Sequence, residues 1–428
     1  MTFENFSQKV EKTMLPVTNF VNTNKSVQAI TSGFISANPI ILGAALFAII
    51  ANFPIPAWTS FLSETGVAVH LSAIIQATSN LLALYVVFAI AYRYAKSEGE
   101  DALTSGILSV ASFVIIMPQT VEGKEAEISA LMTKYLGSEG LFVALIISLI
   151  SAKIFVKLMK KGLVIKLPDS VPEMVARSLA PTFVSMIIFA VAVGIRIGFS
   201  FTAWGNAFNF VGTIVGRPIV ALGSSIPAII CAYTFMNFMW FFGIHPSPIM
   251  GIYMPVIMSI NLMNIEAMQA GTVLPYLAND IVKTTVYMGG TGTTLGLIIA
   301  MVISAKSKRY KTILKLAIVP NIFNINEPLI FGLPMMLNPI FLIPMVLSPV
   351  CLGVVSYLMS GLVNPASYNP AVQVVSTVPT VVTAFFKGGL PFVFILLVCL
   401  AVNTLLYLPF FKILDNKEYK LEQENGKE

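Results

Sequence analysis

The chain has 428 residues, of which 56% are hydrophobic and only 11% are charged, and its mean hydropathy is +0.84. This composition excludes an ordinary soluble domain and indicates a membrane protein with several spanning segments. The net charge of +6 does not predict a nucleic-acid partner, because Lys and Arg concentrate in short loops, as the positive-inside rule describes.

The first 25 residues carry charged side chains before any long apolar run, and they lack the short apolar core and cleavage site of a signal peptide. We therefore expect the first membrane helix to direct insertion. Five apolar stretches follow that are long enough to cross about 30 Å of hydrocarbon. They lie near 27–51, 70–92, 102–119, 140–158 and 180–203. The loops at 93–101 and 157–177 are the more basic ones, which predicts a cytoplasmic N-terminus.

The second half of the chain is less regular. It is expected to contain an interfacial crossover helix at 205–220, a helix at 221–243, a broken proline-bearing stretch at 245–263, and spans near 284–305, 335–361 and 386–411. Between the spans at 284–305 and 335–361, the stretch 312–331 is interrupted by Pro320 and Pro328, which predicts two half-helices that meet at a turn. The predicted fold is an all-α polytopic membrane protein with about ten transmembrane helices, two re-entrant hairpins and both termini in the cytoplasm.

Glu327 lies in the run 321–328 with apolar sequence on both sides. Placing a carboxylate at membrane depth costs free energy, so we take such a residue as a candidate for a functional site. Together with Asn324, Asn326 and a histidine, it can exchange hydrogen bonds with several sugar hydroxyls. A purely local alternative is that Asn326 caps a helix and Glu327 favours the positive end of the helix dipole.

His245 follows Trp240 in a short stretch where Gly243 and Pro246 are expected to break a helix beside an ionisable ring. Broken helices at membrane depth recur in transporter sites. The alternative is a polar residue that ends a helix at the interface. Trp240 and the aromatic residues around it are candidates for stacking on a pyranose ring, or for ordinary helix packing.

The glycine-rich stretch 288–294 can present backbone amides to a ligand or allow close helix packing. It is not a phosphate-binding loop, because no Lys-Ser or Lys-Thr follows at the required spacing. Gly290, Thr291 and Gly292 are therefore candidate substrate contacts. Arg177 is a further candidate, and its alternative role is to mark the cytoplasmic side.

Together these motifs resemble the membrane subunit, enzyme IIC, of the sugar phosphotransferase system, in its lactose/cellobiose/chitobiose family. The resemblance covers essentially the whole chain. Its most specific parts are 240–245 and 324–328, followed by Phe331-Gly332 and Asn338-Pro339, and its supporting parts are 172–181 and 289–292. One departure is Pro246, where the family more often has a small residue.

The resemblance implies a dimer formed by an N-terminal half at 1–203, a crossover at 204–220, a sugar-binding half at 221–411 that encloses the sugar between re-entrant hairpins, and a cytoplasmic tail at 412–428. It also implies that His245 and Glu327 lie near the 6-hydroxyl of the sugar.

The implied activity is that of the translocating subunit of a sugar phosphotransferase in the bacterial cytoplasmic membrane. A β-linked disaccharide of the cellobiose or diacetylchitobiose type enters from outside and is carried by an elevator-like movement. A phosphorylated cysteine of a separate enzyme IIB then donates its phosphoryl group to the 6-hydroxyl.

Cys231, Cys351 and Cys399 lie in apolar stretches, with neither metal-ligand spacing nor a disulfide pattern. We therefore expect no metal and no cofactor, and we expect the phosphoryl donor on another polypeptide. The basic loops at 153–166 and 306–315 are candidates for docking that anionic partner, or they report topology alone.

Two other functions stay open from the residues. A secondary transporter would couple sugar entry to protons through Glu327 and His245, since intramembrane carboxylates often act as relays. A membrane enzyme acting on a lipid-linked sugar is the weaker alternative, because no second carboxylate or set of metal ligands is found at membrane depth.

Overall fold

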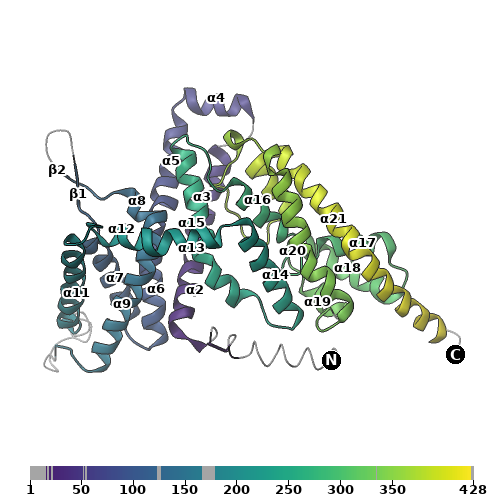
Figure 1. Ribbon diagram of the computed structural model, residues 1–428, viewed down its shortest axis with the longest axis horizontal. Helices are drawn as coiled ribbons and strands as arrows, with labels where there is room; N and C mark the ends of the chain where they lie inside the picture. Colours follow the sequence, from purple (N-terminus) through teal and green to yellow (C-terminus); the bar gives the residue numbers. More distant parts are fainter. Residues whose placement is uncertain are drawn as a thin grey trace.

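The computed structural model describes residues 16, 19–20, 23–51, 53, 55–122, 127–165, 179–333 and 335–425. Within them the chain is almost entirely helical (Figure 1). One short antiparallel hairpin, β1 (Thr120–Glu122) with β2 (Glu127–Ser129), is added to the all-α fold that the sequence predicts. Arg177 and most of the 172–181 motif lie outside the described residues.

The N-terminal helices form a bundle with α6 at its centre. They are α2 (Lys25–Ser36), α3 (Asn38–Ala51), α4 (Pro56–Glu64), α5 (Val67–Ala77), α6 (Leu82–Ser97), α7 (Ala102–Ile116), α8 (Thr133–Leu136), α9 (Leu141–Lys160) and α11 (Thr182–Ser200). α6 packs against α2, α7 and α9 and buries small and β-branched side chains such as Ala83, Val87 and Ala91. These side chains let the helices approach closely, as is usual between membrane helices.

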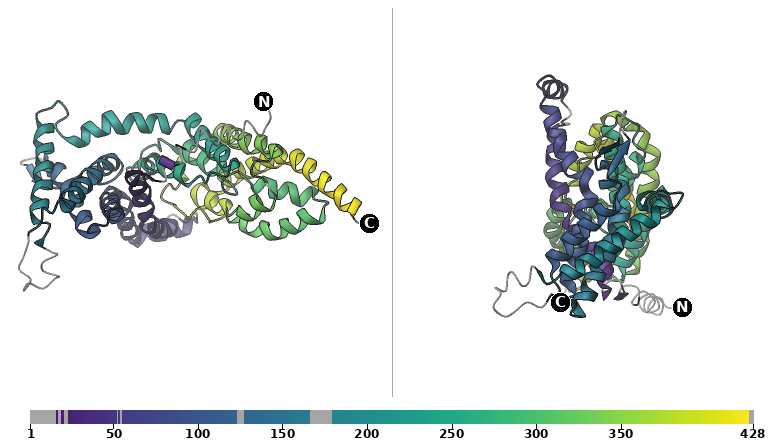
Figure 2. Two further views of the ribbon diagram at one scale, coloured as in Figure 1. Left: turned by 90° about the horizontal axis from the view of Figure 1, so that it is seen from below. Right: turned by 90° about the vertical axis from the view of Figure 1, so that its left-hand side faces the viewer.

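A helix that runs across the molecule connects this bundle to the C-terminal helices. It consists of α12 (Ala207–Val211), the π-helical turn Gly212–Gly216 and α13 (Arg217–Gly223), and it lies along one side of the molecule in the left view of Figure 2. A bend of 70° separates it from α14 (Ile226–Phe241). It occupies the residues for which the sequence predicts a crossover, and its depth in the membrane stays a prediction.

α15 (Ser247–Gln269) differs from the broken stretch predicted at 245–263, because it is one helix of 23 residues with Pro255 inside it. The interruption is confined to the residues between α14 and α15. α15 buries Val256, Ile260 and Ile265 in the same core as α2, α6 and α9, although the sequence division assigns it to the C-terminal half. Ile249 and Met250, at the start of α15, pack on a core of the C-terminal helices instead, so this end of α15 lies where the two parts of the molecule meet.

The predicted span at 284–305 is not a single helix. It is divided into the end of α16 (Leu277–Val286), a loop at 287–294 and α17 (Leu295–Ser304). Three glycines in this loop have positive φ, and Thr293 has a φ of 52°. A helix needs negative φ throughout, so the backbone turns here although the composition is apolar.

The two half-helices predicted at 312–331 are present as α18 (Lys308–Ile322) and α19 (Glu327–Gly332), joined by the turn 323–326. α20 (Pro339–Met359) follows, and an irregular segment at 363–379, which contains the 3-10 turn Pro365–Ser367, leads to α21 (Thr380–Asn425). The two re-entrant hairpins expected from the sequence stay a prediction.

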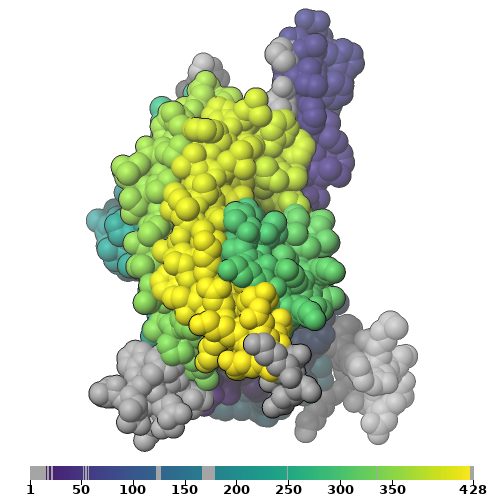
Figure 3. Space-filling view, turned by 90° about the vertical axis from the view of Figure 1, so that its right-hand side faces the viewer, coloured from purple at the N-terminus to yellow at the C-terminus, as the bar shows by residue number. Residues whose placement is uncertain are grey.

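α21 runs along the face seen in Figure 3 and packs against α17 and α18. The sequence predicts a solvated tail from 412, but the helix continues through this point to Asn425, and Asp415 is buried. Asp415 accepts hydrogen bonds from the backbone N–H groups of Lys306 (2.7 Å) and Ser307 (3.0 Å), just before α18. Free N–H groups and the positive dipole end at a helix start attract carboxylates, which explains the docking of the tail.

Within the described residues, seven helical segments are long and apolar enough to cross a membrane, or eight if the bent pair α12–α14 counts as one span. They are Lys25–Ala51, Val67–Ser97, Ser138–Lys160, Thr182–Ser200, Ile249–Gln269, Pro339–Leu362 and Thr380–Glu424. α7 and α17 are apolar but shorter. The number of ten crossings stays a prediction.

Candidate functional site

A cavity with about 940 Å³ of empty space, including its open mouth, lies where α2, the start of α15, the loop 287–294 and the turn 323–326 meet. It brings together six of the nine residues predicted for the site, although they are distant in sequence. These are Trp240, His245, Thr291, Asn324, Asn326 and Glu327. Gly290 and Gly292 belong to the loop that forms one wall, and Arg177 is outside the described residues.

The glycine loop and the turn 323–326 interlock. The backbone N–H of Gly289 donates to Asn324 Oδ1 at 2.9 Å, and Asn326 Nδ2 donates to the carbonyl of Thr291. A Cβ on Gly290, whose φ is +84°, would lie 2.7 Å from the carbonyl oxygen of Asn324. Only glycine permits both this conformation and this close approach.

The far side of the same loop is hydrogen-bonded to two helices, α14 and α21, and α14 is bonded in turn to α20. Asn237 on α14 accepts from the N–H of Gly292 at 2.7 Å and donates to the carbonyl of Met345 on α20 at 2.9 Å. Asn403 on α21 donates to the carbonyl of Thr293 at 2.6 Å. All of these groups are buried, so the loop is a rigid wall whose polar backbone is satisfied within the protein.

Asn324 uses its whole side-chain amide to join neighbouring segments. Its Oδ1 also accepts from Thr380 Oγ1 at 3.2 Å, and its Nδ2 donates to the carbonyls of Ser376 (2.7 Å) and Val378 (3.0 Å). With the bond from the glycine loop, both donors and both acceptor positions of the amide are occupied. Asn324 lines the cavity but serves mainly to fix the turn, and its contact with a ligand stays a prediction.

Asn326 occupies the N-cap position of α19, yet its side chain makes no capping hydrogen bond and reaches to the glycine loop instead. The capping role that the local explanation gives to Asn326 is therefore wrong, whereas Glu327 does lie in the first turn of α19, as that explanation expects. Glu327 is the first residue of α19, and its side chain is exposed and lines the cavity. It forms no ion pair with any residue in the described part of the chain, so its carboxylate is available to a ligand.

The break before His245 is built by Gly243, whose φ of +79° ends α14. The N–H of Ile244 reaches back to the carbonyl of Met239 at 3.0 Å, in the pattern of a glycine-terminated helix. The N–H of Ser247 donates to Nδ1 of His245 at 3.2 Å. The hydroxyl of Ser247 also lies 2.7 Å from Nδ1. The backbone donor favours the ring tautomer with its proton on Nε2, and this N–H can donate to a ligand.

Trp240 holds the imidazole from one side. The two ring centroids are 5.1 Å apart and nearly perpendicular, and the ring of Phe331 lies 6.5 Å from the indole. Trp240 Nε1 is buried and has no hydrogen-bond partner among the described residues, which is unusual for an indole N–H. The aromatic residues that the sequence groups around Trp240 are Phe235, Phe238, Phe241 and Phe242. Of these five residues only Trp240 lines the cavity in the described structure, and Phe241 and Phe242 are buried in the core.

Several residues of the cavity carry no signal in the sequence. Thr31 and Ile35 on α2, Met250 on α15 and Tyr287 before the glycine loop all line it. They are uncharged and lie in apolar or mixed stretches, so neither charge nor spacing distinguishes them from packing residues. Within the described residues, no group of three or more His, Cys, Asp or Glu side chains gathers to hold a metal ion.

A bundle of apolar helices around a cavity with a carboxylate, an imidazole and an indole defines a membrane permease for a polar solute. The chain belongs to the EIIC family of the phosphotransferase system, whose model matches residues 31–349. The family resemblance of the sequence motifs is thereby confirmed.

Known members are similar over nearly the whole chain. The galactose-specific EIIC component of Lactococcus lactis subsp. cremoris (strain MG1363) is 41% identical, covering 99% of this chain and 98% of the relative. The cellobiose-specific EIIC component of Geobacillus stearothermophilus is 32% identical, covering 98% and 96%. The crystal structure of ChbC, the IIC component for N,N'-diacetylchitobiose, matches with a TM-score of 0.89 at 34% identity, covering 97% of this chain and 99% of ChbC.

Proposed function

We propose that this EIIC protein imports a β-linked disaccharide and presents its 6-hydroxyl to a separate phosphorylated enzyme IIB. The observation that carries the proposal is one cavity lined by both Glu327 and His245. An ionised carboxylate accepts hydrogen bonds but cannot donate them, whereas Nε2 of the imidazole can donate. Such a complementary pair suits hydroxyl groups, each of which donates and accepts. The similarity to the cellobiose-specific and diacetylchitobiose-specific components supports the choice of sugar.

The chemistry asks mainly for positioning. The phosphorus–sulfur bond of a phosphocysteine on enzyme IIB breaks, and a phosphorus–oxygen bond to the 6-hydroxyl forms. Glu327 orients this hydroxyl and accepts its proton, while His245 donates to a neighbouring sugar oxygen. Phosphoryl transfer needs little covalent work from the protein, so alignment and charge stabilisation provide most of the acceleration.

Membership of the family and the distribution of charge support a placement in the cell. We place the protein in the bacterial cytoplasmic membrane, as a homodimer with both termini in the cytoplasm. α11 supports a lipid-facing or dimer-facing N-terminal half, because it exposes large apolar residues. These are Phe183, Met186, Ile187, Val191, Val193 and Ile197. An elevator-like movement is supported by the position of the cavity between α15, which packs on the N-terminal core, and α19, which packs on the C-terminal core.

Galactose or a galactoside is the second candidate substrate, because the relative at 41% identity is specific for galactose. Selectivity between epimeric sugars depends on one or two hydrogen bonds in the pocket, and a change in a few side chains is enough to alter it. A test of the function must therefore include glucosides and galactosides together.

The test uses inside-out vesicles that contain the protein, phosphorylated enzyme IIB and radiolabelled cellobiose, diacetylchitobiose, lactose or galactose. We expect phosphorylated sugar that depends on enzyme IIB and is lost in Glu327→Gln and strongly reduced in His245→Ala. Glu64→Gln makes the same chemical change on exposed α4 and should behave as wild type. Movement of unmodified sugar driven by a pH gradient, without enzyme IIB, would reject the proposal in favour of a proton-coupled transporter.

A further inference from the structure

A second compartment adjoins the cavity of Glu327 and His245. It has about 1230 Å³ of empty space, including its opening, and it shares Met250, Met254, Tyr287 and Ser376 with that cavity. The two spaces are therefore contiguous. The polar residues Asn38, Ser79, Asn261 and Gln373 also line the second compartment. Such a mixture of apolar surface and a few polar groups is typical of ligand pockets.

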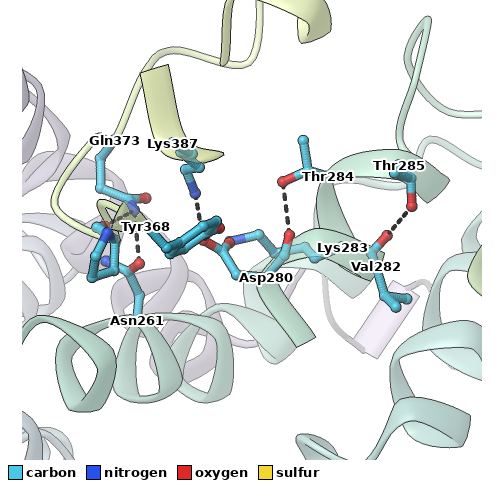
Figure 4. Close-up of polar contacts among 10 residues, drawn as sticks. Asn261, Asp280, Val282, Lys283, Thr284, Thr285, Tyr368, Gln373 and Lys387 are labelled. Atoms are coloured by element: carbon cyan, nitrogen blue, oxygen red, sulfur yellow. Dashed lines mark hydrogen bonds and ion pairs between the residues drawn. The ribbon is translucent and has the colours of Figure 1, made fainter. Parts of the chain in front are cut away.

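Lys283 is the one charged side chain among the described residues that line the second compartment. Figure 4 shows its surroundings on α16. Asp280, one turn earlier, is 3% exposed, and its carboxylate lies 2.7 Å from Lys283 Nζ and 2.6 Å from Lys387 Nζ. The hydroxyl of Tyr368 donates to the same carboxylate at 2.6 Å. The cluster thus holds two cations and one anion.

One positive charge in this cluster is in excess. Lys387 is 4% exposed and by itself neutralises Asp280, with Tyr368 satisfying a further lone pair. Lys387 and Tyr368 both contact Oδ2, and Lys283 pairs with Oδ1 of the same carboxylate, so a second cation lies beside a single anion. An extra cation inside a membrane protein costs free energy, and such residues are retained mainly where they bind something. Lys283 is 21% exposed, and it lines the second compartment.

We infer that Lys283 binds hydroxyl oxygens of the second ring of a disaccharide, in the second compartment, while the first ring lies beside Glu327 and His245. This inference rests on the proposed function and deepens it. An ammonium has three N–H donors, and the ion pair with Asp280 leaves donors for sugar oxygens. Hydrogen bonds from a charged donor are stronger than neutral ones, so Lys283 selects disaccharides over monosaccharides.

The wall of this compartment is fixed in a way that suits such a role. Gln373 Nε2 donates to Asn261 Oδ1 at 2.7 Å, joining the segment 363–379 to α15, as Figure 4 shows. The N–H of Asn369 in the same segment donates to the carbonyl of Lys387 at 2.7 Å. Asp280 therefore holds Lys283 in place from α16, while the opposite wall is held by its own hydrogen bonds.

The experiment measures sugar binding by titration calorimetry on the purified full-length protein in detergent, without enzyme IIB. Cellobiose and lactose are compared with glucose and galactose for wild type, Lys283→Met and Lys387→Met. Lys387→Met is the matched control, because it removes the same charge from the same carboxylate. We expect Lys283→Met to weaken disaccharide binding by at least about tenfold more than monosaccharide binding, a difference of about 1.4 kcal/mol. Lys387→Met should weaken both classes by similar factors.

Equal weakening of both sugar classes by Lys283→Met, or the same selectivity change in Lys387→Met, would show that the cluster only supports the fold. If thermal unfolding shows that Lys283→Met is poorly folded, Lys283→Gln repeats the comparison with a polar end of similar length. A wild-type protein that binds neither class overturns the proposed function and this inference together. Selective binding without phosphorylation in the vesicle assay overturns only the proposed function.

Discussion

Replacing Asn324 by alanine should loosen the turn that carries Glu327. Its amide joins this turn to the glycine loop through the N–H of Gly289, and to the segment 363–379 through the carbonyls of Ser376 and Val378. Asn324 also has a φ of 60°, a conformation that asparagine tolerates far better than alanine. The substitution therefore removes contacts and adds backbone strain.

The magnitude follows from four hydrogen bonds. Each contributes about 0.6 kcal/mol by the average found between membrane helices and about 1 kcal/mol by the general average. Their sum is about 2 to 4 kcal/mol, and the left-handed backbone adds about 1 kcal/mol for alanine. We expect the free energy of unfolding to fall by about 3 to 5 kcal/mol, with weaker sugar binding because Glu327 is no longer held in place.

The assay is denaturant titration in mixed micelles, followed by tryptophan fluorescence, with sugar binding measured on the same samples. Asn364→Ala is the matched control, since Asn364 is exposed and its side chain accepts one hydrogen bond, from the N–H of Ala366. It should cost less than about 1 kcal/mol. An Asn324→Ala protein as stable as this control would refute the view that the amide fastens the turn.

Three further predictions follow from the fold. Gly290→Ala should reduce sugar binding by more than about tenfold in calorimetry, because its Cβ would press on the carbonyl of Asn324 and its φ of +84° is strained. Unchanged affinity would contradict the tight approach. Asp415→Asn should lower the midpoint of thermal unfolding, since Asn carries no negative charge to interact with the N-terminus of α18. An unchanged midpoint would mean that this contact does not contribute to stability. Hydrogen bonds from Lys160 and Lys25 hold the pKa of Glu98 below its ordinary value. This stabilisation is fully present when the pH is above the ordinary pKa of a glutamate, and it is lost as the pH falls through the lower pKa of the folded state. The thermal midpoints of wild type and Glu98→Gln should therefore converge in acid, and a constant gap would exclude the pair as the cause.

The sequence by itself determined the class of protein and the local breaks in its helices. Apolar stretches of membrane length are a local property, and so are the effects of Gly243 and of Pro328 on the backbone. The helix end before His245 and the turn before Glu327 were therefore predictable. Their meeting in one cavity was suggested only by the family resemblance, because contact between residues 82 positions apart is not a local property.

The tertiary structure decided the rest. An apolar count could not show that the run 284–305 is divided at its glycines, because the turn is stabilised by hydrogen bonds from Asn237 and Asn403 on other helices. It could not show that Asp415 docks on α18, since an isolated charged tail is expected to be solvated. Nor could it show the cluster around Asp280, whose two lysines lie 104 positions apart and meet only when α16 and α21 pack together. Hydropathy and turn signals act within a few residues, whereas sites and charge clusters depend on which helices become neighbours.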